Sequence, residues 1–84
     1  MYEILFESKA EKELLELPKE DLKRIDTKIR QLNKNPRPPG IKKLVGKIEG
    51  WRIRAGDYRI LYQIDDEKKL VKVYRIKHRR EVYR

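Results

Sequence analysis

The sequence predicts an α+β domain, in which two helices from the N-terminal half pack on one face of a small, mainly antiparallel sheet in the order β-α-α-β-β-β. Apolar residues alternate near the N-terminus and again after residue 50, which is typical of strands, and they recur with helical period between residues 9 and 32. The last strands are joined by short polar turns, which favour antiparallel pairing. The length of 84 residues predicts that residues 1–84 form a single domain. Because the helical pair must bury its apolar stripe, we expect it to cover one face of the sheet and leave the other open.

The first half of the chain predicts one strand and two helices. A strand is expected over residues 2–7, where apolar and polar side chains alternate. Ser8 and Glu11 have the spacing of a capping box, which predicts a helix over residues 9–17. Pro18 ends that helix and suits the first turn of the next one, which precedes a proline-rich loop. The apolar stripe of the second helix consists of Leu22, Ile25, Ile29 and Leu32.

The second half predicts the remaining strands. Residues 41–45 and 48–54 are expected to form one interrupted strand or two short ones, and further strands are expected at 59–65 and 70–78. In the last strand Val71 and Val73 share a face, but Ile76 falls out of phase with them. A β-bulge near Tyr74 or Arg75 would restore the phase. We interpret the residues from 79 to the end as a basic tail.

Gly56-Asp57 predicts a two-residue hairpin turn between alternating segments. That turn places Arg54 opposite Arg59, and one face of the hairpin is then apolar: Trp51, Ile53, Tyr58, Ile60, Tyr62 and Ile64. The other face carries Arg52, Arg54 and Arg59. Like charges directly across a ladder destabilise it, so an anionic ligand between these arginines would explain their pairing.

Charge and composition narrow the function. The net charge of +9 is uneven, since residues 1–40 hold nine basic and eight acidic residues and residues 41–84 hold fourteen and six. Such a field attracts phosphate-rich or acidic partners. There is no cysteine and one histidine, so we expect no disulfide and no metal or other cofactor. No apolar run could span a membrane and no signal peptide is apparent, which predicts a soluble cytoplasmic protein without a membrane partner.

The basic residues suggest chemistry on RNA. The open face gathers Arg52, Arg54 and Arg59, with Lys72 on the neighbouring strand, and the C-terminal part adds Lys77, His78, Arg79, Arg80 and Tyr83. Arginine binds phosphate oxygens through paired hydrogen bonds, and basic residues interleaved with aromatic ones suit single-stranded RNA. Metal-free RNA cleavage needs cations for the phosphorane charge, a proton acceptor and a proton donor. The arginines fit the first role, and Tyr83 or His78 the others, with Glu81 or Glu49 as less favoured alternatives for the base.

Structural roles are alternatives for the same residues. The arginines of the open face could be ordinary solvated strand residues, and Arg59 could pair with Asp57 or Asp65. His78 could pack at the end of its strand, and Tyr83 could anchor the C-terminus in the core.

The chain resembles the RelE/ParE superfamily of bacterial and archaeal toxins over nearly its whole length. The resemblance is carried by the run Trp51-Arg52-Ile53-Arg54, by Gly56-Asp57-Tyr58-Arg59, and by the ending His78-Arg79-Arg80-Glu81-Val82-Tyr83, which together match the RelE branch. It implies the toxin of a type II toxin–antitoxin system that cuts mRNA in the ribosomal A site. It also implies an acidic RelB-like antitoxin, with operator DNA bound only through the toxin–antitoxin complex.

Residue by residue, the resemblance implies a catalytic set of Arg52, Arg54, Arg59, Arg79 and Tyr83. Arginine replaces the lysine of the family at the first two positions, and arginine carries protons less readily. The fourth position is ambiguous, with Lys77 or His78 as alternatives, and His78 remains a candidate acid or base. Further RNA contacts are expected from Lys72, Lys77 and Arg80. The competing interpretations are a ParE-like inhibitor of DNA gyrase, which lacks the nuclease residues, and an RNA-binding module that does not cut.

Overall fold

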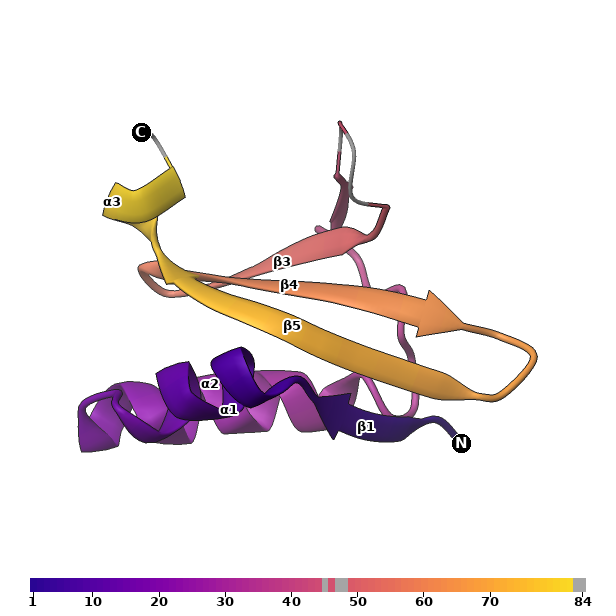
Figure 1. Ribbon diagram of the computed structural model, residues 1–84, viewed down its shortest axis with the longest axis horizontal. Helices are drawn as coiled ribbons and strands as arrows, with labels where there is room; N and C mark the ends of the chain where they lie inside the picture. The colour runs from indigo at the N-terminus through magenta and orange to yellow at the C-terminus, as the bar shows by residue number, and fades with distance from the viewer. Residues whose placement is uncertain (45, 47–48, 83–84) are drawn as a thin grey trace.

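The computed structural model describes residues 1–44, 46 and 49–82, the last two by their backbone alone. The elements in chain order are β1 (Glu3–Phe6), α1 (Ser8–Leu15), α2 (Lys19–Gln31), β2 (Lys42–Lys43), β3 (Trp51–Ala55), β4 (Tyr58–Asp65), β5 (Leu70–His78) and α3 (Arg79–Val82). The strands form one sheet in the order β1-β5-β4-β3-β2, and α1 and α2 lie together on one face of it (Figure 1). The predicted α+β class is therefore confirmed. We call the opposite face of the sheet the open face.

The sheet is antiparallel except at one edge. Strands β2, β3, β4 and β5 pair antiparallel in turn, whereas β1 runs parallel to β5, with Ile4 beside Val71. The expected strand or strands between residues 41 and 54 are two strands that pair with each other. The predicted end at Val45 and start at Ile48 lie outside the described residues.

The predicted hairpin register is confirmed at each pair. Trp51 faces Tyr62, and Arg54 faces Arg59. Gly56 has a φ of +61°, the value that the first central position of a type II′ turn requires. Because that turn matches the twist of the strands, it fixes which side chains share a face.

A β-bulge at Tyr74 adjusts the phase of β5, as the sequence predicts. Leu61 pairs with Arg75 while its neighbour Tyr62 pairs with Val73, so Tyr74 is the extra residue. Beyond the bulge Ile76 returns to the core side. The same shift brings residue 77 onto the face that residue 72 occupies, although the two positions differ by five, an odd number.

The core lies between the two helices and the sheet. Helix α2 contributes the predicted stripe, of which Leu22 is half-buried and the other members are buried, and α1 contributes Ala10. The sheet contributes Ile53, Ile60, Tyr62, Val71, Val73 and Ile76. Tyr62 is fully buried, and its hydroxyl donates to the carbonyl of Pro36 at 2.8 Å. Burial raises the pKa of Tyr62 to about 12, against a smaller opposite effect of Arg37.

The start of α1 differs from the prediction. The helix begins at Ser8, Glu7 occupies the N-cap position, and no side-chain cap hydrogen bond forms, so the predicted capping box is wrong. The amide of Glu7 donates to the carbonyl of Val73 at 2.9 Å. This bond holds Glu7 beside β5 at the N-cap position, so the helix begins one residue earlier than predicted and Ser8 falls inside its first turn.

The predicted basic tail begins as the short helix α3. It rises from the end of β5 on the side of the sheet away from α1 and α2 (Figure 1). The amide of Arg79 donates to the carbonyl of Asp57 at 2.7 Å, which ties the start of α3 to the β3–β4 turn. This helix therefore stands beside one end of the open face.

Asp66 joins three separate segments at the opposite end of the sheet. Its carboxylate accepts hydrogen bonds from the Tyr2 hydroxyl at 2.6 Å and from the Arg37 guanidinium at 3.2 and 2.9 Å. These bonds link the N-terminus, the loop after α2 and the β4–β5 turn. The bonds from Arg37 and then Tyr2 lower the pKa of Asp66 to about 2.

The Asp66 cluster predicts a specific acid sensitivity. The folded pKa lies below the ordinary value of 3.8, so Asp66 contributes stability above about pH 4 and loses that contribution as the pH falls through 2. We expect Asp66→Asn to lower the urea midpoint at pH 6, and the difference from the parent protein to shrink between pH 4 and 2. Glu67→Gln, on the same turn, serves as the control. A deficit of the Asp66 variant that stays constant down to pH 2 would contradict this account.

Candidate functional site

Three basic residues stand directly across three strands of the open face. Arg54 of β3 faces Arg59 of β4, and Arg59 faces Lys77 of β5. We call these three residues the cationic row. The β3–β4 turn sets the first pair and the Tyr74 bulge sets the second, because without the bulge Lys77 would point to the core. The sequence predicted each member, and the structure brings them together.

The members of the cationic row are held to different degrees. Arg54 is exposed, and its Nε donates to the carbonyl of Gly56 at 3.1 Å, so it lies back over the turn. Arg59 and Lys77 are half-buried. Partial burial strengthens the field that these cations exert on a neighbouring anion, because less water screens them.

A second row of the open face lies next to the cationic row. It consists of Lys42, Arg52, Leu61 and Arg75. Arg52 was predicted at this face, but Lys42 was missed by the sequence reasoning. Lys42 reaches this face because β2 pairs with β3. That pairing depends on the path of the chain between the two strands, so no local motif in the sequence could have identified Lys42.

Arg75 is engaged by a carboxylate from α1. Its guanidinium donates to both oxygens of Glu13, with the shortest distance, 2.9 Å, between Nη2 and Oε2. Glu13 also accepts the backbone amide of Ile76 at 2.9 Å. Strand β1 ends its pairing at Phe6 beside Val73, so Glu13 covers the edge of β5 beyond that point. Arg75 therefore helps to attach α1 to the edge of the sheet.

Removing Glu13 is expected to destabilise the fold. Both side chains of the Glu13–Arg75 pair are less than a quarter exposed, and Glu13→Ala leaves a partly buried guanidinium without this carboxylate. We expect a loss of about 3 kcal/mol in the free energy of unfolding, measured by urea denaturation. Glu16→Ala, one residue beyond the end of the same helix and exposed, should change it by less than about 0.5 kcal/mol. Equal effects of the two substitutions would argue against this role for the pair.

The other predicted cations, Lys72 and Arg80 as RNA contacts and Arg79 as a catalytic residue, lie away from the cationic row. Lys72 faces Gln63, and its ammonium group lies 3.3 Å from the Glu7 carboxylate. Arg79 is exposed and lies 3.7 Å from the carboxylate of Asp57 at the β3–β4 turn. Arg80 is also exposed, on α3. These cations border the open face and do not join its centre.

His78 occupies the other side of the sheet. It pairs with Tyr58, and the two rings meet edge to face with centroids 5.1 Å apart. The hydroxyl of Tyr58 donates to Asp21 of α2 at 3.4 Å, so this pair belongs to the helix-covered side. The Nδ1 atom of His78 accepts the amide of Arg80 at 3.2 Å. The structure therefore does not bring the imidazole together with the cationic row.

The predicted catalytic residue Tyr83 lies outside the described residues.

Another tyrosine, Tyr74, is buried at the bulge, outside the core cluster. Its hydroxyl has no hydrogen-bond partner within the described part of the chain. Burial, together with the nearby Glu7 carboxylate, raises the pKa of Tyr74. Sequence reasoning identified Tyr74 only as a bulge residue.

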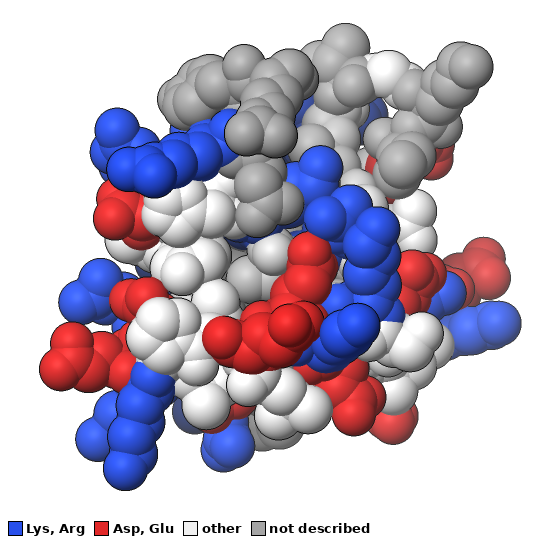
Figure 2. All heavy atoms as spheres, turned by 60° about the vertical axis from the view of Figure 1, so that its left-hand side comes forward, with Lys and Arg blue, Asp and Glu red and all other residues white. Residues whose placement is uncertain are grey.

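The excess positive charge belongs to the sheet half of the chain. Over the helical layer, basic and acidic side chains are interspersed at the end of the molecule that carries the β3–β4 turn (Figure 2). Farther along α2, Arg30 and Asp26 form an exposed ion pair at 2.9 Å. Among the residues with assigned positions, His, Asp and Glu form no cluster of three that could hold a metal ion. Helices in the same part of the chain are too short or too polar to cross a membrane.

Comparison with known proteins defines the family. Residues 4–83 match the family model described as the ParE toxin of the type II toxin–antitoxin system parDE. The toxin RelG of Mycobacterium tuberculosis is 34% identical over 99% of this chain and 97% of its own length.

Two solved structures extend this likeness to the fold. The archaeal RelE–RelB complex from Pyrococcus horikoshii contains a chain with a TM-score of 0.81 and 29% identity, covering 93% of this chain and 94% of that one. The isolated RelE toxin of E. coli has a TM-score of 0.80 and 30% identity, over 99% and 92% of the two chains. This chain belongs to the RelE/ParE toxin superfamily, as a type II toxin–antitoxin toxin of the RelE family.

Proposed function

We propose that the protein is an endoribonuclease that cuts mRNA in the ribosomal A site without a metal ion and so inhibits translation. The cationic row is the observation that carries the proposal. Three basic side chains aligned across three strands repel one another and cost stability. They lie on the face that α1 and α2 leave uncovered (Figure 1). A phosphate group above the row would offset the repulsion, and arginine binds phosphate through paired hydrogen bonds.

The proposed reaction is attack of a ribose 2′-oxygen on the adjacent phosphorus. The 2′-hydroxyl loses its proton to a base, the bond between phosphorus and the 5′-oxygen breaks, and the leaving oxygen takes a proton from an acid. The products are a 2′,3′-cyclic phosphate and a 5′-hydroxyl. Cations fixed beside the phosphorus stabilise the charge that develops, which is often the largest contribution to such a rate. Arg54 and Arg59 have this role in the proposal, with Arg52 and Lys77 beside them.

In this proposal, a residue near the C-terminus carries out one of the two proton transfers. Tyr83 is the proposed acid or base, because the ending of this chain matches that of the family and a positive environment lowers the pKa of a phenol. We give His78 no such role, since it faces Tyr58 on the helix-covered side. Arg79 and Arg80 contribute to binding the RNA backbone from the border of the open face, as does Lys72.

The proposed partners follow from the family. The toxin from Pyrococcus horikoshii is solved as a RelE–RelB complex. We infer that an acidic RelB-like antitoxin neutralises this chain, and that operator DNA is bound only by the toxin–antitoxin complex. A net charge of +9 favours an acidic partner.

Substitution of Arg59 is the first test. Arg59→Ala should lower cleavage of ribosome-bound mRNA by roughly 10²- to 10³-fold while the circular dichroism spectrum stays that of the parent protein. Tyr83→Phe should also lower cleavage, by roughly 10²-fold or more. Arg30→Ala, which removes the same charge from α2, should leave the rate within about twofold. Full cleavage by both site variants would refute the assignment.

The ends of the products test the mechanism itself. Mass spectrometry of the fragments should find a 2′,3′-cyclic phosphate and a 5′-hydroxyl, and a 2′-deoxyribose at the cleaved position should abolish cleavage. The family model's description as a ParE toxin favours one alternative, inhibition of DNA gyrase. That function predicts loss of supercoiling in a purified gyrase assay with mRNA left intact. An intact message together with inhibited gyrase would replace the nuclease proposal.

A further inference from the structure

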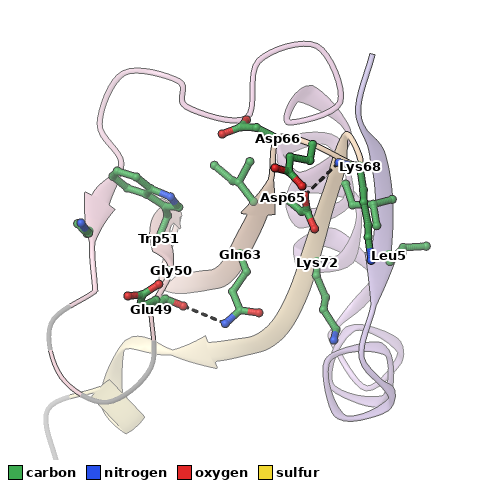
Figure 3. A pocket seen from close by; sticks show the side chains of 13 residues that line it. Leu5, Glu49, Gly50, Trp51, Gln63, Asp65, Asp66, Lys68 and Lys72 are labelled. Carbon is green, nitrogen blue, oxygen red and sulfur yellow. Dashed lines mark hydrogen bonds between the residues drawn. The ribbon is translucent and has the colours of Figure 1, made fainter.

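The end of the open face remote from the cationic row is hollowed into a pocket of about 810 Å³, and of its lining the proposed function uses Lys72 alone. Gln63 and Lys72 face each other across its floor, with Leu5 of β1 beside Lys72 (Figure 3). Gly50 also lines the pocket, and its backbone approaches β4 so closely that a Cβ there would come within 2.6 Å of the Tyr62 carbonyl oxygen. The volume falls within the range of small-molecule sites, roughly 300–1,000 Å³.

The polar groups of this pocket are held in fixed directions. The amide nitrogen of Gln63 donates to the carbonyl of Glu49 at 3.0 Å, which turns its amide oxygen to the other side (Figure 3). The Oδ1 atom of Asp65 accepts the amide of Lys68 at 3.0 Å. The indole of Trp51 borders the pocket opposite Lys72 (Figure 3), from the apolar side of β3, where it packs against the core and lies 5.9 Å from the Arg37 guanidinium. An aromatic wall with fixed donors and acceptors is the chemistry that recognises an unstacked nucleobase.

The charges of the pocket favour a base over a phosphate. Carboxylates of Glu49, Asp65 and Glu67 line it together with lysines. Carboxylates repel phosphate but accept hydrogen bonds from the exocyclic amino groups of bases. A nucleobase, which carries both donors and acceptors, therefore matches this lining.

Strand β4 connects the pocket with the cationic row. Arg59 and Gln63 lie on the same face of β4, four residues apart, which corresponds to about 13 Å along the strand. A single RNA strand whose backbone crosses the row could therefore direct the base of a nearby nucleotide into the pocket. Row and pocket then form one continuous binding surface.

We propose that this pocket holds one unstacked base of the RNA strand that crosses the cationic row, and that it thereby contributes to sequence preference. The inference rests on the proposed function and deepens it. The row binds backbone phosphate, which carries no sequence information, whereas the pocket reads a base.

The test measures binding of the full-length protein to single-stranded RNA hexamers by fluorescence anisotropy. One nucleotide at a time is replaced by an abasic residue. At one position the abasic RNA should bind about tenfold more weakly, as expected for one lost stacked base. Asp65→Asn, which keeps the oxygen that accepts the Lys68 amide, and Gln63→Ala should each shrink this ratio towards one. Glu20→Gln on α2 changes the charge equally and should leave the ratio unchanged.

The outcomes separate the two proposals. If the parent protein binds no hexamer, both the proposed RNA-binding role of the cationic row and the proposed base-binding role of the pocket are refuted. If RNA binds and Arg59→Ala weakens it, but no abasic position matters, only the pocket proposal is overturned. Unchanged abasic ratios in the two pocket variants, together with lost neutralisation by a RelB-type antitoxin, would assign the pocket to a protein partner and also overturn it.

Discussion

The register that joins β3, β4 and β5 is the constraint on which the rest of the structure depends. Two local features fix it: the turn at Gly56, whose φ of +61° suits glycine, and the bulge at Tyr74. Since side chains alternate along a strand, a shift of one residue would move the arginines into the core and the apolar residues into water. The turn and the bulge therefore decide at the same time what is buried and which cations stand together.

The two faces of the sheet differ in composition: one packs the apolar core, and the other carries the cationic row. Apolar side chains of α2 cover the core face. The hydroxyl of Tyr62, buried on this face, donates a hydrogen bond to the carbonyl of Pro36 in the loop after that helix. The open face accumulates like charges, which oppose folding unless an anion lies between them. In the proposed function, the phosphate backbone of the RNA target lies between these cations and offsets this cost.

Long-range polar contacts hold the two ends of this sheet. Glu13 of α1 satisfies both Arg75 and the amide of Ile76 at the edge that β1 leaves, over a separation of more than sixty residues. Asp66 gathers Tyr2 and Arg37 at the other end. Each contact fastens a segment outside the central hairpin to the sheet: α1 through Glu13, and the N-terminus and the loop after α2 through Asp66.

The sequence by itself determined the helical stripe, the hairpin register and the bulge, because each follows from a local period or from one turn residue. It also identified Arg54, Arg59 and Lys77 individually. Only the tertiary structure decided that β1 pairs parallel with β5, that Lys42 joins the open face, and that His78 turns to the helical side. These outcomes depend on contacts between segments far apart in the chain, whose packing no local pattern of side chains encodes.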